Sequence, residues 1–203
     1  MAQRPTGVLW DVGNVIVRWD PRTLYSKIFP DPAQRDWFLA EVCTQAWHIE
    51  HDRGRPMAEG IAALSAQFPG HAPAIAAWKD RWPEMFSGPI PETVQAIEGL
   101  AARGVPMFGL TNMSAETAAN TFAMDPAFGH LRQIVVSGEV GLIKPDPRFF
   151  ALALERIGQP AGSLLFVDDN ADNIAAATAL GFATHLFDDP VALAPALKGF
   201  GLL

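Results

Sequence analysis

The sequence of 203 residues predicts an α/β protein in which helices sandwich a parallel β-sheet and a helical cap is inserted after the first strand. Short apolar runs alternate with helical patterns from Pro91 onward, which is typical of right-handed βαβ units and a parallel sheet. A further apolar run, Gly7–Trp10, is separated from these by a long stretch without a convincing strand. We therefore expect residues 1–17 and 89–203 to form the core domain and residues 18–88 the cap.

The core elements follow one another in a regular order. Gly7–Trp10 is predicted as a buried strand because a continuous apolar run ends there at an aspartate and a turn dipeptide, Gly13-Asn14. Proline at the start and glycine after the end mark a helix at Pro91–Arg103. The same criteria predict the remaining elements of this Rossmann-like arrangement: strands at Val105–Leu110, Gln133–Ser137, Ser163–Val167 and Ala183–Leu186, and helices at Ala115–Phe122, Arg148–Ile157, Asp172–Leu180 and Val191–Leu197.

Residues 18–88 have a different character. Proline and glycine divide them into helical patterns at Gln34–Ile49, Met57–Phe68 and Ala72–Met85, and five of the six tryptophans lie here. Trp47 and Trp82 are more typical of a core than of a surface that stacks on a sugar. Cys43, in the first helical pattern, is predicted to be a buried structural thiol. Several basic residues could contact a substrate, although each alone is more typical of surface charge: Arg18, Arg22, His48, His51, Arg53 and Arg55.

The composition limits the classes of function. A formal net charge of −7 and scattered basic residues argue against a nucleic-acid surface. Because there is no stretch of about 18 apolar residues and no charged leader before an apolar run, we expect no membrane span and no signal peptide. A single cysteine is compatible with a reducing, cytoplasmic location. We expect a monomer or a homodimer with a small-molecule substrate.

Polar residues follow the predicted strands at the points where these end. Asp11 follows the first strand, Thr111-Asn112 the second, and Asp168-Asp169 the fourth, while Lys144 comes after the third. Because parallel strands present their carboxyl ends at one edge of the sheet, these side chains are expected to converge there. Converging carboxylates repel one another, and a divalent cation relieves that repulsion. Hard oxygen ligands with open positions for water favour Mg²⁺.

Four sequence motifs carry a family resemblance. D-V-G-N-V at Asp11, L-T-N ending at Asn112, G-L-I-K-P-D around Lys144 and V-D-D-N around Asp168 resemble, in order and spacing, the four motifs of the haloacid dehalogenase-like hydrolase superfamily. The first and last motifs are similar to those of its sugar-phosphate phosphatases, such as bacterial glucose-1-phosphate phosphatases. They also resemble the phosphatase-like N-terminal domains of epoxide hydrolases. The resemblance covers nearly the whole chain, including the place of the cap.

The resemblance implies a Mg²⁺-dependent phosphatase that acts on a small phosphorylated metabolite, and it assigns a role to each motif residue. Asp11 would attack phosphorus and become a phospho-aspartate, and Lys144 would neutralise charge between nucleophile and phosphate. Thr111 and Asn112 would hold the phosphoryl oxygens. The metal would be held by Asp11, the Gly13 carbonyl, Asp168 and Asp169. Asn173 is equally compatible with a helix cap and with a partner of the metal site, whereas Asp172 is expected to face solvent.

The sequence departs from the superfamily at one position. Most of its phosphatases carry a second aspartate, as general acid and base, where this chain has Gly13. General acid–base catalysis typically contributes about 10²–10⁴-fold. The phosphatases that this chain most resembles share the glycine, so we do not interpret it as inactivation. A substrate with a good leaving group, such as a sugar 1-phosphate, would show the smallest loss of hydrolysis rate from the missing acid.

Two other functions compete with the phosphatase interpretation. A 2-haloacid dehalogenase has the same fold and needs no metal, but such enzymes resemble one another in an aromatic residue at the Gly13 position and in uncharged residues at Asp168-Asp169. A non-catalytic binding protein that retains the fold would be favoured if Asp11 or Lys144 were replaced, and both are present.

Overall fold

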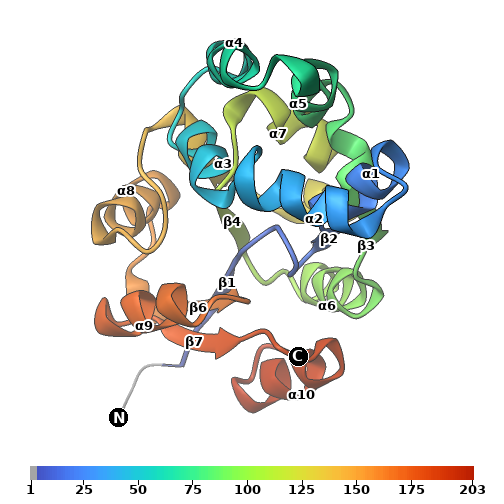
Figure 1. Cartoon of the computed structure of the whole chain (residues 1–203). Helices are drawn as coiled ribbons and strands as arrows, with labels where there is room; N and C mark the ends of the chain where they lie inside the picture. The colour runs from blue at the N-terminus through green and yellow to red at the C-terminus, as the bar shows by residue number, and fades with distance from the viewer. Residues whose placement is uncertain (1–3) are drawn as a thin grey trace.

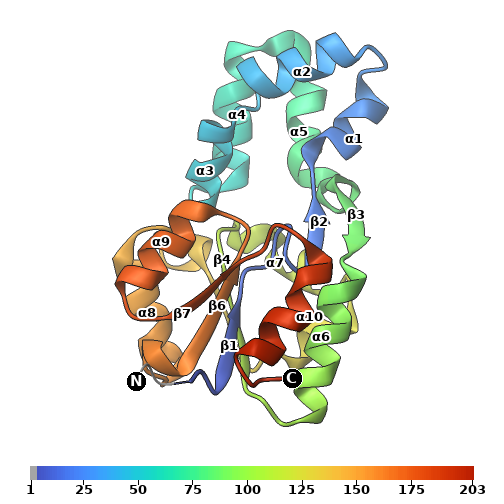
Figure 2. The same cartoon turned by 90° about the horizontal axis from the view of Figure 1, so that it is seen from below.

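The computed structural model describes residues 4–203, and within them a parallel sheet forms the centre of the molecule. Its strand order is β5-β4-β1-β6-β7, so the first strand of the chain lies in the middle (Figure 2). Every neighbouring pair is parallel, and both β4 and β6 pair with β1 along its length. The strands are β1 Gly7–Trp10, β4 Met107–Thr111, β5 Ile134–Val136, β6 Leu164–Asp168 and β7 Ala183–Leu186. The predicted α/β class is confirmed.

Helices cover both faces of this sheet (Figures 1 and 2). Successive strand residues point to opposite faces, so Val8 and Trp10 belong to one hydrophobic cluster and Leu9 to another. The first cluster is covered by α6 Pro91–Ala102, α7 Ala115–Phe122 and α10 Pro190–Gly199, the second by α8 Pro147–Ile157 and α9 Ala171–Ala179. Burial on both faces explains why the strands are apolar runs rather than alternating patterns.

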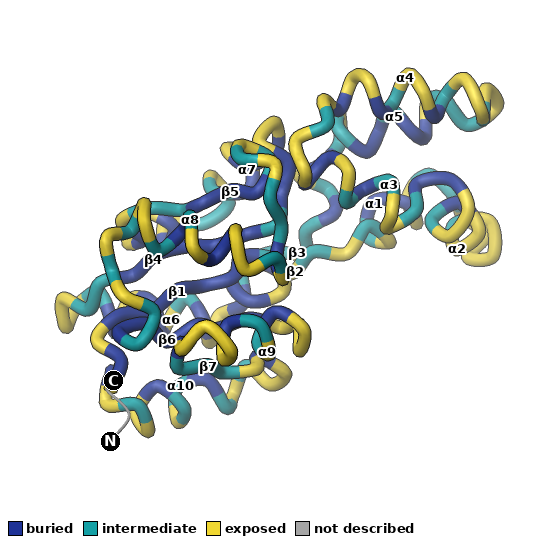
Figure 3. The backbone as a smooth tube through the Cα atoms, turned by 90° about the vertical axis from the view of Figure 1, so that its left-hand side faces the viewer, coloured by how far each residue is buried: buried dark blue, intermediate teal, exposed yellow. Residues whose placement is uncertain are grey.

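The inserted segment forms a helical layer that stands beyond one end of the sheet (Figures 2 and 3). Its own buried cluster, built around Leu24, Tyr25, Phe38 and Trp78, is separate from the two clusters of the sheet. This separation supports the proposed division into a core, 1–17 and 89–203, and a cap, 18–88. The helices of the insertion are α1 Pro21–Ile28, α2 Pro32–Glu41, α3 Gln45–Asp52, α4 Met57–Gln67 and α5 Ala72–Asp80.

The prediction that the insertion contains no strand is wrong. β2, Val17–Trp19, and β3, Phe86–Pro89, pair antiparallel as a ribbon between the sheet and the cap helices. β2 has three residues, one of them Arg18, and β3 has four residues that include Gly88 and Pro89, so neither has the length of an apolar run that would reveal a strand from sequence. β2 leads from the core into the cap and β3 leads back, so their pairing holds the two ends of the insertion side by side.

The helical pattern Gln34–Ile49 is two helices in the structure. α2 ends at Glu41, and the Thr44 hydroxyl accepts the Trp47 backbone N–H as the cap of α3. Cys43 therefore lies in the connection rather than in a helix, although it is buried as predicted, and burial raises the pKa of its thiol to about 12. The pattern Ala72–Met85 ends as an α-helix at Asp80, and α1 was not predicted.

Single turns of 3₁₀-helix complete the chain, at Pro69–His71, Trp82–Met85, Pro126–His130, Ser137–Glu139 and Ala161–Ser163. No helix in the described part of the chain has both the length and the apolar character needed to cross a membrane.

Candidate active site

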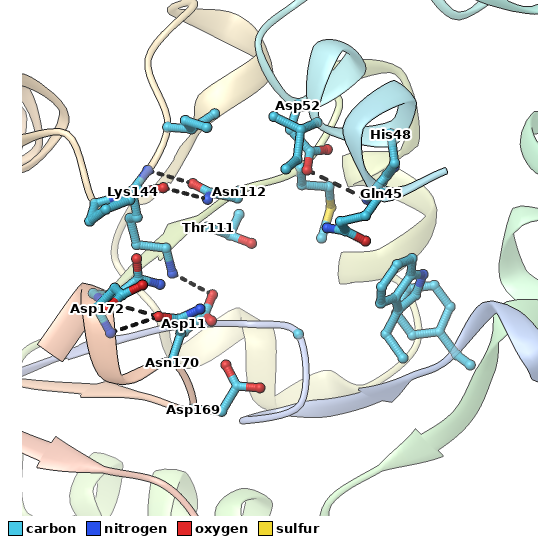
Figure 4. Close-up of a pocket in the computed structure, with 18 of the residues that line it drawn as sticks. Asp11, Gln45, His48, Asp52, Thr111, Asn112, Lys144, Asp169, Asn170 and Asp172 are labelled. Carbon is cyan, nitrogen blue, oxygen red and sulfur yellow. Dashed lines mark hydrogen bonds and ion pairs between the residues drawn. The ribbon is translucent and has the colours of Figure 1, made fainter. Parts of the chain in front are cut away.

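The carboxyl ends of three adjacent strands place the candidate residues at one edge of the sheet. Asp11 directly follows β1, Thr111 is the last residue of β4, and Asp168 is the last residue of β6. Asp11, Asp168 and Asp169 each offer a carboxylate oxygen, and these oxygens lie within 4.8 Å of one another. The convergence expected from the sequence is therefore present in the structure, and Figure 4 shows Asp11, Thr111 and Asp169 at this edge.

Lys144 lies between two of these carboxylates. Its Nζ is 2.7 Å from Asp11 Oδ1 and 2.7 Å from Asp168 Oδ2, and its side chain is only 1% exposed. Burial by itself lowers the pKa of Lys144, but the two carboxylates outweigh that effect and raise it, so the ammonium group keeps its proton.

Asn112 fixes the loop that carries this lysine. Its side-chain carbonyl accepts the Lys144 backbone N–H at 2.8 Å, and its side-chain amide donates to the Lys144 carbonyl at 3.0 Å (Figure 4). These two hydrogen bonds join the end of β4 to the loop before α8. The Asn112 side chain is thereby committed to holding Lys144, which leaves its backbone N–H as the group available to a ligand.

Asp168 is fully buried and its oxygens already have partners. Besides Lys144, they accept the Asn173 side-chain amide at 3.0 and 3.1 Å and the Asn170 backbone N–H at 2.8 Å. Asn173 is thus a hydrogen-bond partner of Asp168, while the cap of α9 is Asn170. Asp172 is exposed in the first turn of α9, as expected.

The charges of the cluster do not balance. Three carboxylates share one ammonium group, so two negative charges remain when all four side chains are ionised. Burial, reinforced by the charges of Asp168 and Asp169, raises the pKa of Asp11 despite the opposing effect of Lys144. Asp169, by contrast, is exposed. The donor set is therefore hard, oxygen-rich, short of positive charge and open on the Asp169 side, and these properties fit Mg²⁺.

A cavity of about 390 Å³ lies over this cluster, between the sheet edge and the cap. Its floor includes Asp11, Thr111, Lys144 and Asp169 (Figure 4), and Gly13 also lines it. This size is sufficient for a small organic molecule. The remaining lining residues come largely from the cap and the loops around it: Trp19, Gln45, His48, Ile49, Asp52, Trp82, Phe86, Asn112, Met113, Ile143, Pro145, Asn170, Asp172 and Asn173.

Of the basic cap residues considered from sequence, His48 lines this cavity. Arg18 and Arg22 line a different hollow, and Arg53 lines a third. His51 is buried against Trp47, and Arg55 pairs with Glu59 on the surface.

The sequence alone does not identify Gln45 and Asp52, and it favours a core position for Trp82 over a surface that stacks on a sugar. Trp82 is buried and also forms part of the cavity wall. The signal available was the spacing of Gln45, His48 and Asp52, which puts all three on one side of a helix. Because the sequence pattern does not place a helix start at Thr44, the sequence alone does not tell which side of the helix faces the cavity.

A sequence model for haloacid dehalogenase-like hydrolases matches residues 6–181. The chain belongs to this hydrolase family. Solved structures with the same fold include an HAD family enzyme from Bacteroides thetaiotaomicron in complex with magnesium and inorganic phosphate. It superposes with a TM-score of 0.68 at 18% identity, over 90% of this chain and 93% of that one.

Relatives within the family have different named activities. The chain is 33% identical over 104 residues to a phosphatase of Mycobacterium tuberculosis, a match that covers 51% of this chain and 48% of that protein. It is also 34% identical over 97 residues to an (S)-2-haloacid dehalogenase of Pseudomonas putida, covering 46% and 41%. This HAD-like chain spans less than half the length of the curated relatives it matches.

Proposed function

We propose that this protein is a Mg²⁺-dependent phosphatase that hydrolyses a small phosphorylated metabolite through a phospho-aspartate on Asp11. The observation that carries the proposal is the charge of the cluster, in which three converging carboxylates share one lysine at the floor of a cavity. Such a cluster favours a divalent cation and, through it, a dianionic phosphate. A sugar phosphate, especially a sugar 1-phosphate, is the first substrate class to assay.

Each residue has a distinct role in this proposal. A carboxylate oxygen of Asp11 forms a bond to phosphorus while the bond from phosphorus to the leaving oxygen breaks, and water then hydrolyses the acyl phosphate. Thr111 and the Asn112 backbone N–H hold phosphoryl oxygens, and Lys144 offsets charge on nucleophile and phosphate. Because Gly13 supplies no acid, the leaving oxygen takes its proton from water. Bound Mg²⁺ would add positive charge where negative charge accumulates.

The two neighbouring aspartates are assigned different tasks. Asp169 is exposed and borders the cavity, so we assign it to the metal together with Asp11 and the Gly13 carbonyl. Asp168 is surrounded by Lys144 and Asn173, so we assign it mainly to positioning the lysine. Its second role at the metal, directly or through water, stays a prediction.

The lining of the cavity argues against a 2-haloacid dehalogenase. Among the residues described along this cavity, Lys144 is the one lysine or arginine, and two carboxylates already hold it. A halocarboxylate would therefore meet a negative floor without a free cationic side chain. A non-catalytic binding protein is disfavoured because the buried Lys144 links Asp11 and Asp168 in an arrangement suited to reaction.

Hydrolysis of p-nitrophenyl phosphate tests the proposal. We expect turnover with Mg²⁺ and a loss of at least about 10²-fold with EDTA, because the metal contributes several kcal/mol to such reactions. Restoration by added Mg²⁺ is the control for damage by the chelator. Absence of turnover on this ester and on acetyl phosphate, together with metal-free release of chloride from 2-chloropropionate, would favour the dehalogenase instead.

The Gly13 position offers a second test. A Cβ built on Gly13 meets no atom within 4 Å, so a side chain can begin there without a clash at its first carbon. We expect Gly13→Asp to raise kcat about tenfold on an alkyl phosphate, whose poor leaving group needs a proton, with little change on p-nitrophenyl phosphate. Gly13→Ala is the matched control, since it adds the Cβ without the carboxyl group. Equal rates for the two variants would show that acid catalysis is not what this site lacks.

A further inference from the structure

A second pair of polar side chains lies in the cap wall of the same cavity. His48 and Asp52, one turn apart on α3, are 5% and 4% exposed, and His48 Nε2 is 3.5 Å from Asp52 Oδ2. Both line the cavity that contains Asp11 (Figure 4). The phosphatase chemistry proposed above uses neither residue, so their burial at this place requires a different explanation.

The pair has unused hydrogen-bonding capacity. Within residues 4–203, Asp52 Oδ1 and His48 Nδ1 are buried without a hydrogen-bond partner, which is uncommon for polar atoms in folded proteins. Burial raises the pKa of Asp52 to about 7, opposed only by the nearby Ser114 backbone amide. Burial and the neighbouring His51 lower the pKa of His48 to about 4, so the imidazole is neutral and does not balance the Asp52 charge. A donor from outside would complete the pair.

Aromatic rings adjoin these polar groups. Trp19 stacks on His48 with ring centroids 5.2 Å apart and planes 21° apart. Trp82 lies 6.0 Å from Trp19, and Phe86 lies 5.6 Å from Trp82, and all three rings line the cavity. This wall would accommodate an apolar or flat group, and the faces of its rings also favour a cation.

The cap end of the cavity contrasts with its floor. Along the described lining, the one lysine or arginine is Lys144, which lies at the floor between Asp11 and Asp168. A second phosphate or a carboxylate on the substrate would therefore meet Asp52 and aromatic rings without a compensating charge. Burying an anion without a partner is strongly unfavourable.

We propose that His48 and Asp52 form a specificity subsite for the leaving group of a phosphomonoester, and that this leaving group carries a hydroxyl or ammonium donor on an apolar or flat body and no second anionic group. The inference rests on the proposed phosphatase function. In the bound state the phosphate lies over Asp11, and the donor at the far end of the leaving group reaches the unpaired Asp52 oxygen.

A matched series of esters tests this subsite. Benzyl phosphate and its 4-hydroxymethyl, 4-aminomethyl and 4-carboxy derivatives differ only at the far side of the ring, so the leaving oxygen is nearly the same in all. At pH 8, with Mg²⁺, we expect kcat/KM for the hydroxymethyl and aminomethyl esters to exceed that for benzyl phosphate by about tenfold, mainly through KM. The carboxy ester should fall about tenfold below it.

Variants at Asp52 separate the two kinds of donor. Asp52→Asn keeps a hydrogen-bond acceptor and removes the negative charge. It should therefore abolish the preference for the aminomethyl ester over benzyl phosphate and keep most of the preference for the hydroxymethyl ester. Asp52→Leu should abolish both and bring the carboxy ester close to benzyl phosphate. Glu50→Gln, on the exposed side of the same helix, is the matched control and should leave the ranking unchanged. Thermal unfolding of each variant verifies the fold.

The outcomes distinguish failure of the subsite from failure of the phosphatase proposal. Hydrolysis of all the esters at similar rates, or a ranking that Asp52→Leu does not alter, overturns the subsite alone. If no benzyl ester is hydrolysed, calorimetric binding of the same esters to Asp11→Asn decides about the subsite, and the phosphatase proposal fails only if p-nitrophenyl phosphate is not hydrolysed either. Tighter binding of the donor esters, lost in Asp11→Asn/Asp52→Leu, supports it, and equal or undetectable binding overturns it.

Discussion

We expect Asp11→Asn to lower the proposed phosphatase kcat by at least about 10⁴-fold, since an amide does not replace a carboxylate as the nucleophile. The substitution preserves the shape of the side chain but removes the proposed nucleophile and one of the three carboxylates of the cluster. Steady-state hydrolysis of p-nitrophenyl phosphate with Mg²⁺ measures the loss. Acid quenching of the wild type during turnover, followed by peptide mass spectrometry, should locate the phosphoryl group on Asp11.

The loss of activity is not expected to reflect unfolding. Because the pKa of Asp11 is raised in the folded protein, ionising it lowers the stability as the pH rises from the ordinary carboxyl value through the folded-state value. A neutral asparagine removes this cost, so the unfolding midpoint of Asp11→Asn at pH 8 should equal or exceed that of the wild type. Asp188→Asn, at an exposed aspartate after β7, is the control for activity. Turnover by Asp11→Asn within tenfold of the wild type would rule out Asp11 as the nucleophile.

We expect Lys144→Met to lower the free energy of unfolding by about 3–5 kcal/mol at neutral pH and to lower the proposed phosphatase activity by at least about 10³-fold. The lysine lies 2.7 Å from both Asp11 and Asp168 inside the protein, and methionine leaves these carboxylates without their cation. The unfolding free energy from urea denaturation measures the first effect. Lys198→Met, which replaces an exposed lysine near the C-terminus, should change it little.

The destabilisation by Lys144→Met should depend on pH in a defined direction. Without the ammonium group, the pKa of Asp11 rises further above its unfolded value, so the folded variant binds protons that the unfolded chain releases. The deficit relative to wild type is therefore largest near pH 8 and shrinks as the pH falls toward 5. Added Mg²⁺ should also recover part of it. A deficit that is equal at both pH values would show that lost packing, and not charge, is its cause.

Much of the sheet and its polar edge could be predicted because the signals are local. β1, β4, β6 and β7 are short apolar runs between turns, and the residues that end them lie at the carboxyl edge wherever the strands are parallel. The convergence of Asp11, Lys144 and Asp168 follows from this rule together with the motifs.

The parts that could not be predicted depend on contacts between distant segments. β2 and β3 each extend over only a few residues, and they form a ribbon because Val17 and Pro89 are brought together by the folding of everything between them. The division of the Gln34–Ile49 pattern at Thr44 depends on a side-chain cap and on the packing of α3 against its neighbours, which apolar spacing alone does not encode.

The sequence by itself determined the α/β sheet, the position of the insertion and the edge at which the carboxylates gather, because strand periodicity and strand ends are properties of contiguous residues. Only the tertiary structure decided how the two aspartates of the last motif differ, since Asp168 is buried against Lys144 and Asn173 while Asp169 faces out. It also decided that His48 and Asp52 share a cavity with Asp11. The shape and polarity of that cavity arise where the cap meets the sheet edge, between residues far apart in the chain.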